Sequence, residues 1–485
     1  MGNDAGTGLR RRCSELDVVL PHWLLRHRHH HKHHTLGILS FETAKTMSRL
    51  VSLHKSLTDN QVSRLRNDSV TSEGVAFLIS TDHHFLLNLA CREKIEDLDR
   101  IALAVARLGK HCSSDPTLSQ FGRLYDQLKL GFTNIVTKDA DKMFRKLEKL
   151  VATTAELYSG LQSLTDLEIS EKRMKKWSFD NNGPSSSSSA NFDLFDHKLS
   201  WHKQRVRHLR RVSLWDQTFD KVVSMMAPAV CIVYARILVV FASQVPLMLS
   251  TVYPPTLHED HSNHQQQQQR HQFTKLWADS CSVDYLSRPR PKSNYDEQDC
   301  SNLSKHINVA TTRLLNQLPP STVGGSGLPL GYANVVIMAE RYFMSNCASI
   351  DKREREGLYQ MLPESLRRLV RSKLKEMIRR KDVDFGDADI EWVILGWEEG
   401  AKAILRWLGP MAHDTLRWQT ERNVEKQTFD VKPRVLLLQT LFFADRDKTD
   451  DAIAELLGSL SCISKYKHLI HTKDRGGLRP PNIYF

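Results

Sequence analysis

Closely spaced cysteines are missing from this chain, although it contains eight cysteines. They are the scattered residues Cys13, Cys91, Cys112, Cys231, Cys281, Cys300, Cys347 and Cys462, and none belongs to a C-x-x-C pair. A disulfide scaffold or a structural zinc site would need tighter, repeated spacings. We therefore interpret the cysteines as reduced thiols and expect no metal site.

A secretory signal is also missing, because basic and histidine-rich runs fill most of the first 35 residues. We expect the protein to remain inside the cell. One apolar stretch, residues 229–249, approaches the length of a membrane span. It contains Arg236 and Pro246, which are costly in lipid and ordinary in a soluble core. We interpret it as a buried helix, with a membrane span as the alternative.

Runs of alternating apolar and polar residues, which are typical of β-strands, do not occur in the sequence. Apolar residues instead recur at spacings of three and four, which indicates helices. We predict an all-α fold of helical bundles with long helices, two disordered linkers and a disordered N-terminus rich in His and Arg. The 485 residues are 40% hydrophobic and 26% charged, as in ordinary soluble proteins.

Shifts in composition divide the chain into seven predicted parts. Ser185–Ser189 marks one linker, and Gln265–Gln269 lies in another. The parts are a disordered tail (1–35), an N-terminal helical domain (36–178), a serine-rich linker (179–190), a basic then apolar helix packing on the core (191–250), a disordered linker (251–320), a C-terminal helical domain (321–470) and a tail (471–485).

Several helix ends can be located from capping signals. Asp82 is a predicted N-cap of a helix that ends at Gly109, and Asp115-Pro116 begins the next helix. Residues 138–176 are predicted to form one long helix. Its apolar seam predicts antiparallel packing against another helix of the same chain, or a dimer contact. Further helices are predicted over 357–381 and 389–422, and Asp447 and Thr449 are candidate N-caps of the last helix.

A glycine-rich stretch, Gly324, Gly325, Ser326 and Gly327, leads into the apolar segment Val335–Met344. A phosphate-binding P-loop would need a Lys followed by Ser or Thr after its second glycine, and none is present. A nucleophile elbow would need glycine where Leu328 stands. Two interpretations remain open: a structural turn into a buried helix, or a cradle of backbone N–H groups for an anion.

No other group of residues supports a reaction class. His258 and His261 are three residues apart, whereas the zinc-protease motif separates its histidines by four on a helix. His413-Asp414 is better explained by capping or packing than by a catalytic dyad. We predict that the protein is not an enzyme, with no catalytic residue, no cofactor and no metal.

The net charge of +12 predicts acidic partners. Basic helices over 198–211 and 367–380 could contact phosphates, although most charge runs are solvated faces. Arg210-Arg211-Val212-Ser213 makes Ser213 a candidate phosphorylation site, and Gly2 is a candidate for lipidation, although Gly6 departs from the Ser or Thr of the myristoylation motif.

Several segments together resemble the plant-specific phytosulfokine-simulator-like family, which pairs an N-terminal and a C-terminal domain of unknown function. The segments are Leu36–Leu57, Ser72–Gly74, Val212–Val223, Thr322–Asn334, Gln360–Pro363, Leu408–His413, Arg417–Asn423 and Leu436–Arg446. The resemblance covers most of residues 36–470 apart from the two linkers. It implies growth regulation, phytosulfokine peptide-hormone signalling and, in some members, pathogen-elicited expression. It supplies no catalytic residue.

The resulting expectation is a non-enzymatic plant regulatory or scaffold protein that acts through contacts with other proteins. Peripheral membrane contact is an additional expectation, and nucleic acid is not an expected partner. The nucleus is the expected compartment, with the cytoplasm or the inner face of the plasma membrane as the alternative. The competing function is a sensor of anions or phospholipids that uses Gly324–Gly327 and the adjacent basic helices.

Overall fold

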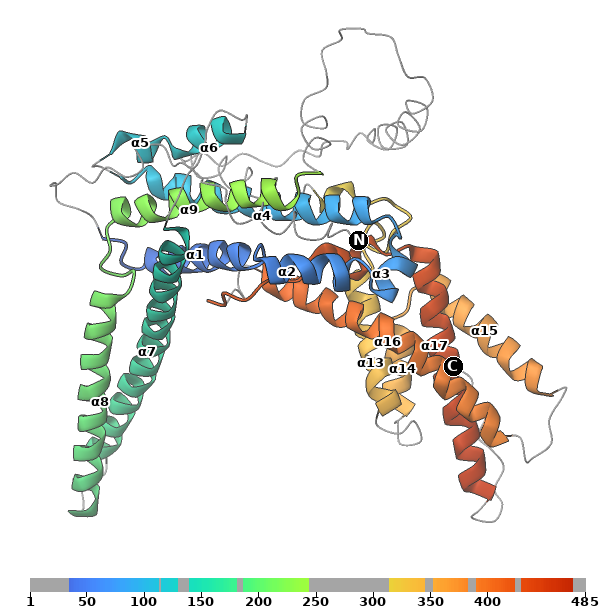
Figure 1. Ribbon diagram of the computed structural model, residues 1–485. Helices are drawn as coiled ribbons and strands as arrows, with labels where there is room; N and C mark the ends of the chain where they lie inside the picture. The colour runs from blue at the N-terminus through green and yellow to red at the C-terminus, as the bar shows by residue number, and fades with distance from the viewer. Residues whose placement is uncertain are drawn as a thin grey trace, which may run out of the picture. The chain divides into compact units, whose positions relative to one another are not determined.

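The computed structural model (Figure 1) describes residues 35–112, 115–129, 139–180, 186–243, 314–344, 352–382, 390–423 and 429–473. Helices dominate these residues, and no β-strand occurs among them. The prediction of an all-α fold is therefore confirmed. The disorder predicted for the N-terminal tail and for the linker over 251–320 concerns residues that, apart from Thr35 and residues 314–320, lie outside the described part of the chain.

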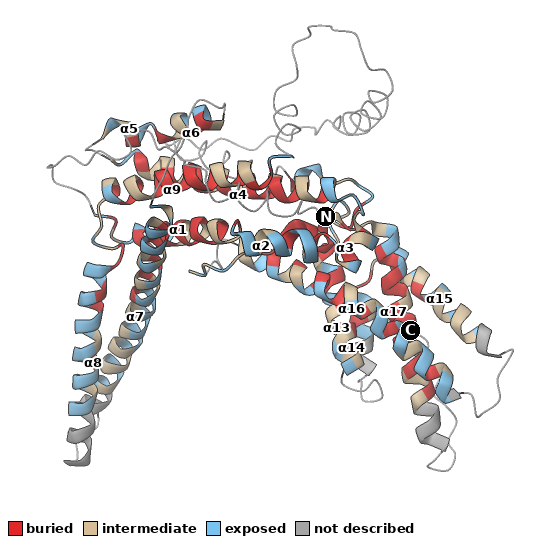
Figure 2. Ribbon diagram, viewed as in Figure 1, coloured by how far each residue is buried: buried red, intermediate tan, exposed pale blue. Residues whose placement is uncertain are grey.

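The N-terminal half contains nine α-helices within the described ranges. They are α1 (Leu39–Lys55), α2 (Asp59–Arg64), α3 (Glu73–Leu78), α4 (His83–Gly109), α5 (Pro116–Ser119), α6 (Phe121–Lys129), α7 (Ala140–Asp180), α8 (Ser186–Val212) and α9 (Phe219–Val240), with a π-helical turn η2 (Leu65–Ser69) after α2. Figure 2 shows buried residues concentrated on α1, α4 and α9, which pack against one another.

Capping explains where several of these helices begin. The side chain of Asp82 accepts a hydrogen bond from the amide of His84 at 2.9 Å, and α4 ends at Gly109, as predicted. Asp115 caps α5 in the same way, with Pro116 at its first position. The helix predicted there breaks at Gln120 into α5 and α6. The carbonyl of Leu118 lies so close to Gly109 that a Cβ on that glycine would be 2.3 Å from it, so α5 docks on the end of α4.

The long helix predicted over 138–176 is α7, which packs side by side with α8 (Figure 1). Leu157, Val206 and Leu209 form their shared apolar core. The intramolecular pairing is therefore confirmed. Helix α7 extends to Asp180 and α8 begins at Ser186, so helix occupies most of the predicted serine-rich linker. Serine is only moderately unfavourable in a helix, and packing on a neighbour can override it.

The C-terminal half begins with a short 3₁₀ helix and continues into five α-helices within the described residues. The elements are η3 (Leu315–Gln317), α13 (Pro329–Met344), α14 (Lys352–Gln360), α15 (Glu364–Asp382), α16 (Ile390–Arg422), the 3₁₀ turns η6 (Leu437–Gln439) and η7 (Leu441–Phe443), and α17 (Arg446–Lys473). The helix predicted over 357–381 is divided between α14 and α15. Pro363 disfavours helical geometry at Leu362, which explains the break.

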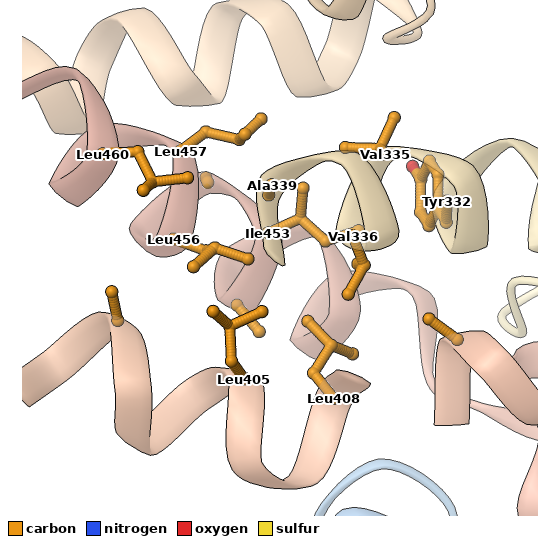
Figure 3. Close-up of a cluster of buried hydrophobic side chains, with 14 of the residues drawn as sticks. Tyr332, Val335, Val336, Ala339, Leu405, Leu408, Ile453, Leu456, Leu457 and Leu460 are labelled. Atoms are coloured by element: carbon orange, nitrogen blue, oxygen red, sulfur yellow. The ribbon is translucent and has the colours of Figure 1, made fainter. Parts of the chain in front are cut away.

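Helix α13 lies in the middle of the C-terminal core (Figure 3). Figure 3 shows Tyr332, Val336 and Ala339 of α13 facing side chains of α16 and α17. The hydroxyl of Tyr332 donates a hydrogen bond to Asp450 of α17. The buried helix predicted after the glycine-rich stretch is therefore confirmed, and it starts at Pro329.

The two helical halves share one compact unit, built from the chain before residue 245 and after residue 309. Leu78 of α3 belongs to the C-terminal core, and its carbonyl accepts a hydrogen bond from the amide of Asp445 at 2.7 Å. The amide of Leu314 donates to Glu96 of α4 at 3.0 Å. Hydrogen bonds and apolar contacts thus connect the regions predicted as separate domains.

Candidate functional site

The backbone of the glycine-rich stretch is already hydrogen-bonded within the protein. The amides of Val323 and Gly324 donate to the carbonyls of Ala444 and Phe442. The next four amides, Gly325 to Leu328, donate to groups within residues 322–324. These donors are therefore engaged in forming the turn, which favours its structural interpretation over an anion cradle.

Close approach of neighbouring backbone explains the glycines of this turn. A Cβ on Gly325 would lie 2.1 Å from the carbonyl oxygen of Pro319, and one on Gly324 would lie 2.4 Å from that of Phe442. Gly327 adopts a φ of +73°, which side chains disfavour. The stretch is thus a tight turn that fixes the start of α13.

Of the other two sequence-predicted sites, Ser213 and Gly2, only Ser213 lies among the described residues. Ser213 is fully buried after the end of α8, and its hydroxyl donates to the carbonyl of Arg210 at 3.3 Å. A kinase could reach that hydroxyl only if this segment opened. Gly2 lies outside the described residues.

Two further features bear on the sequence predictions. Among the described residues, no three His, Cys, Asp or Glu side chains are grouped as metal ligands would be. Helix α9 alone within the described ranges is long and apolar enough to cross a membrane, and 67% of its most apolar window is buried in the protein. Because α9 packs against α1 and α4, its composition is explained by a core position.

A buried carboxylate joins the two halves of the molecule. Glu93 of α4 is 1% exposed. Its Oε1 accepts hydrogen bonds from Trp418 Nε1 at 2.8 Å and from Arg422 Nη2 at 2.5 Å, and its Oε2 accepts from the amide of Leu437 at 2.7 Å. Burial raises the pKa of Glu93, and the charge of Arg422 and the other donors oppose this increase.

Asp97, one turn further along α4, is surrounded by guanidinium groups. Its Oδ1 lies 2.6 Å from Arg100 Nη2, and its Oδ2 lies 3.5 Å from Arg422 Nη2. Burial acts to raise the pKa of Asp97, but Arg100, Arg422, Arg434 and Arg49 together lower it to about 2. Asp97 is therefore ionised at neutral pH.

Lys94 lies beside these carboxylates and is 4% exposed. Its Nζ donates to the hydroxyl of Ser56 at 2.8 Å. Burial lowers the pKa of Lys94 to about 8, against the opposing effect of Glu93 and Asp97. The ammonium group is therefore mostly protonated at neutral pH, in a position where it remains poorly solvated.

Lys94, Asp97 and the neighbouring arginines line a small pocket between α1, α4, α16 and the segment before η6. We call it the charged pocket. Its ionisable lining residues are Arg49, Lys94, Asp97, Arg100, Arg422 and Arg434. Space for the centres of water-sized molecules amounts to about 20 Å³, enough for one or two waters or a small ion. A large cofactor does not fit.

The arrangement can stabilise the junction between the two halves, and its excess of cations can attract an anion. The sequence alone does not reveal this site, because its charges come from segments that are more than 300 residues apart. In the sequence, Arg49, Lys94 and Asp97 occupy polar positions between the apolar residues of helices. Glu93 and Asp97 at a four-residue spacing were the one local signal, and such pairs are common on solvated helix faces.

Comparison with known families gives two matches. Residues 38–94 match a Domain of unknown function (DUF3475), and residues 322–417 match a Protein of unknown function (DUF668). Glu93 lies in the first match, while Trp418 and Arg422 directly follow the second. Neither matching family is described as an enzyme family. No solved structure shows a significant match.

Three curated proteins of Arabidopsis thaliana are similar along most of the chain. Protein PSK SIMULATOR 3 is 24% identical over 93% of this chain and 59% of its own length. Protein PSK SIMULATOR 1 is 23% identical over 88% of this chain and 55% of its own length. Protein PSK SIMULATOR 2 is 23% identical over 92% of this chain and 63% of its own length.

The chain thus spans between 55% and 63% of the length of these relatives. Their similarity extends through both family matches and the sequence between them. The resemblance drawn from the sequence motifs is confirmed: the proteins similar to this chain are PSK SIMULATOR proteins, and the chain matches both domains of unknown function.

Proposed function

We propose that this chain is a non-enzymatic regulatory protein of plant growth that takes part in phytosulfokine signalling by contacting other proteins. The observation that carries the proposal is its similarity, over 88–93% of the chain, to three proteins named PSK SIMULATOR. A role in defence signalling belongs to the same proposal.

The paired helices α7 and α8 support a role in protein contacts. Leu194 is 74% exposed and Trp201 is 53% exposed on α8, and Ile169 is 42% exposed on α7. Arg205 lies over the ring of Trp201 at 5.4 Å. Exposed aromatic and arginine side chains are enriched where proteins bind one another.

Affinity purification from plant tissue tests the contact with proteins. The tagged chain should recover a partner in constant proportion, and the double variant Leu194→Ala, Trp201→Ala should lose most of it. Gln204→Ala, at another exposed position of α8, is the matched control and should retain the partner. Recovery of chaperones alone, or equal recovery by all three proteins, would contradict the proposal.

Growth measurements test the connection to the hormone. Plants that lack the protein should respond less to applied phytosulfokine, and the wild-type chain should restore the response. The Gln204→Ala chain should restore it as well, whereas the double variant should not. An unchanged response in the deficient plants would remove phytosulfokine from the proposal.

The proposal places the protein in the nucleus, with the cytoplasm or the inner face of the plasma membrane as the alternative. A fluorescent protein fused to the C-terminus leaves Gly2 available for lipidation. Wild type and Gly2→Ala should both appear in the nucleus. Membrane fluorescence that disappears in Gly2→Ala would instead show that a lipid anchor determines the location.

The second candidate function is a sensor of anions or phospholipids at Gly324–Gly327 and the adjacent basic helices. The amides of that turn already donate to the protein, so the basic helix α15 is what supports this candidate. Thermal unfolding with phosphoinositide vesicles tests it, since a ligand of the native state raises the melting temperature. No increase at saturating lipid would reject it.

A further inference from the structure

We infer that the charged pocket binds a phosphate group, either as inorganic phosphate or as the phosphate of a small soluble monoester. Five cationic side chains and one carboxylate line the pocket. Glu93, which lies behind the lining, adds a second carboxylate. The cations exceed these two carboxylates by three, and Glu421 beside Arg434 and Glu96 beside Arg100 reduce the local excess to one, in a place where little water is available to screen the charges.

Guanidinium groups at the pocket retain unused hydrogen-bond donors. The buried Nε atoms of Arg49 and Arg422 have no acceptor among the described residues. Lys94 Nζ has Ser56 Oγ as its hydrogen-bond acceptor within the same residues, and an ammonium group carries three donors. A ligand with several acceptor oxygens would satisfy these groups at once, since buried donors without acceptors are costly.

The size of the pocket suits a phosphate group. Its space for the centres of water-sized molecules is about 20 Å³. The four oxygen centres of a phosphate lie on a sphere of about 14 Å³, and each oxygen is about as large as a water. The volume is therefore compatible with one phosphate group as the small ion, and the rest of a monoester would exceed it. Asp97 and Arg100 of the lining are 18% and 16% exposed, so the pocket is not fully closed to solvent.

Asp97 gives the pocket a means to distinguish phosphate from sulfate. An ionised carboxylate repels an oxyanion that carries no proton. Inorganic phosphate near neutral pH carries one or two protons, and a monoester carries one on part of its population, so both can donate a hydrogen bond to the carboxylate, whereas sulfate has no proton to donate. The same cations would hold either ion, so the preference for phosphate depends on Asp97.

Calorimetric titration at pH 7, on the full chain purified without phosphate, tests the inference. Inorganic phosphate, glycerol 3-phosphate and sulfate are compared at ionic strength matched with sodium chloride. Inorganic phosphate should bind saturably and more tightly than sulfate. Equal binding of glycerol 3-phosphate would assign the pocket to monoesters, and binding of inorganic phosphate alone would assign it to the free ion.

Arg49→Met and Arg434→Met each remove one cation from the lining. Each should weaken phosphate binding by about 10- to 100-fold, as expected for a lost charge-assisted hydrogen bond. Arg205→Met is the matched control, because it removes the same charge from the exposed face of α8. Circular dichroism verifies that each variant is folded.

Saturable phosphate binding that both pocket variants weaken and Arg205→Met preserves would establish the site. No saturable heat with phosphate would overturn the inference, and so would equal losses in all three variants, which would indicate diffuse attraction to a basic protein. Asp97→Asn adds an independent criterion, since it should reduce the preference for phosphate over sulfate. If Asp97→Asn does not fold, Arg49→Met and Arg434→Met decide whether the site exists.

Discussion

The replacement Glu93→Ala should strongly destabilise the protein, because it removes the acceptor shared by both halves of the molecule. Trp418 Nε1 and the amide of Leu437 would lose their buried acceptor. Arg422 would retain Asp97 at 3.5 Å as its remaining carboxylate. Breaking a buried ion pair from one side costs about 3–5 kcal/mol. This is a large fraction of the about 5–15 kcal/mol that stabilises most native proteins.

Urea unfolding followed by far-ultraviolet circular dichroism measures this loss. Tryptophan fluorescence, to which Trp418 and the eight other tryptophans contribute, gives a second signal. Glu156→Ala is the matched control, because Glu156 is 56% exposed and pairs with Arg205 at 3.8 Å. Exposed pairs of this kind contribute about 0–1 kcal/mol, so the control should unfold at nearly the wild-type urea concentration.

A double-mutant cycle with Arg422→Met separates the ion pair from other effects of the replacement. If the pair is coupled, the double variant should be more stable than the sum of the single losses predicts, by about 2 kcal/mol or more. A loss below about 1 kcal/mol for Glu93→Ala would refute the reasoning. Additive losses in the cycle would show that Arg422 does not depend on Glu93.

Three further outcomes are expected. Gly325→Val should destabilise the protein by about 2 kcal/mol or more, because its Cβ would overlap a backbone carbonyl. The control Gly331→Ala has open space around its Cβ and should not destabilise the protein. Equal melting temperatures of the two variants would contradict this prediction. His54 stacks on Phe144, and burial lowers the pKa of His54 to about 4 from 6.5. Between pH 6.5 and 4, His54 is therefore protonated in the unfolded chain and neutral in the folded chain. The free energy of unfolding should fall as pH decreases through this range. In urea titrations, His54→Phe should remove that part of the pH dependence. Buried Ser213 should remain unphosphorylated when the folded protein is incubated with a basophilic kinase, and it should be phosphorylated after unfolding. Mass spectrometry measures both. Rapid phosphorylation of the folded protein would show that the segment opens readily.

Local signals in the sequence were sufficient for much of the helical framework. Asp82 and Gly109 delimit α4 because capping depends on neighbouring residues. The last helix shows the limit of such signals. Asp447 and Thr449 were the expected caps, whereas Asp445 Oδ1 accepts the amide of Lys448 at 3.0 Å. The adjacent backbone of Thr322 and Leu78 places Asp445 there, and that contact is not local.

The charged pocket could not be predicted, because its chemistry depends on tertiary contacts. In the sequence, Arg49 and Asp97 resemble solvent-exposed positions of amphipathic helices. Only the folded structure shows that α16 covers them. The glycine-rich stretch shows the opposite case. Its composition was compatible with an anion cradle, and the tertiary contacts with residues 442–444 use its first amides instead. In both cases, the function of a polar group depends on a distant segment.

The hydrogen bonds of Glu93 can form only late in the synthesis of the protein. Glu93 and Leu437 are separated by 344 residues, so the ribosome, at about 5–20 residues per second, makes the donor about 20–70 s after the acceptor. Trp418 and Arg422 are made only shortly before Leu437. During that interval, α4 has a carboxylate whose buried partners do not yet exist. The N-terminal helices therefore cannot complete their native burial during synthesis, and the nascent chain must remain soluble until its last helices emerge.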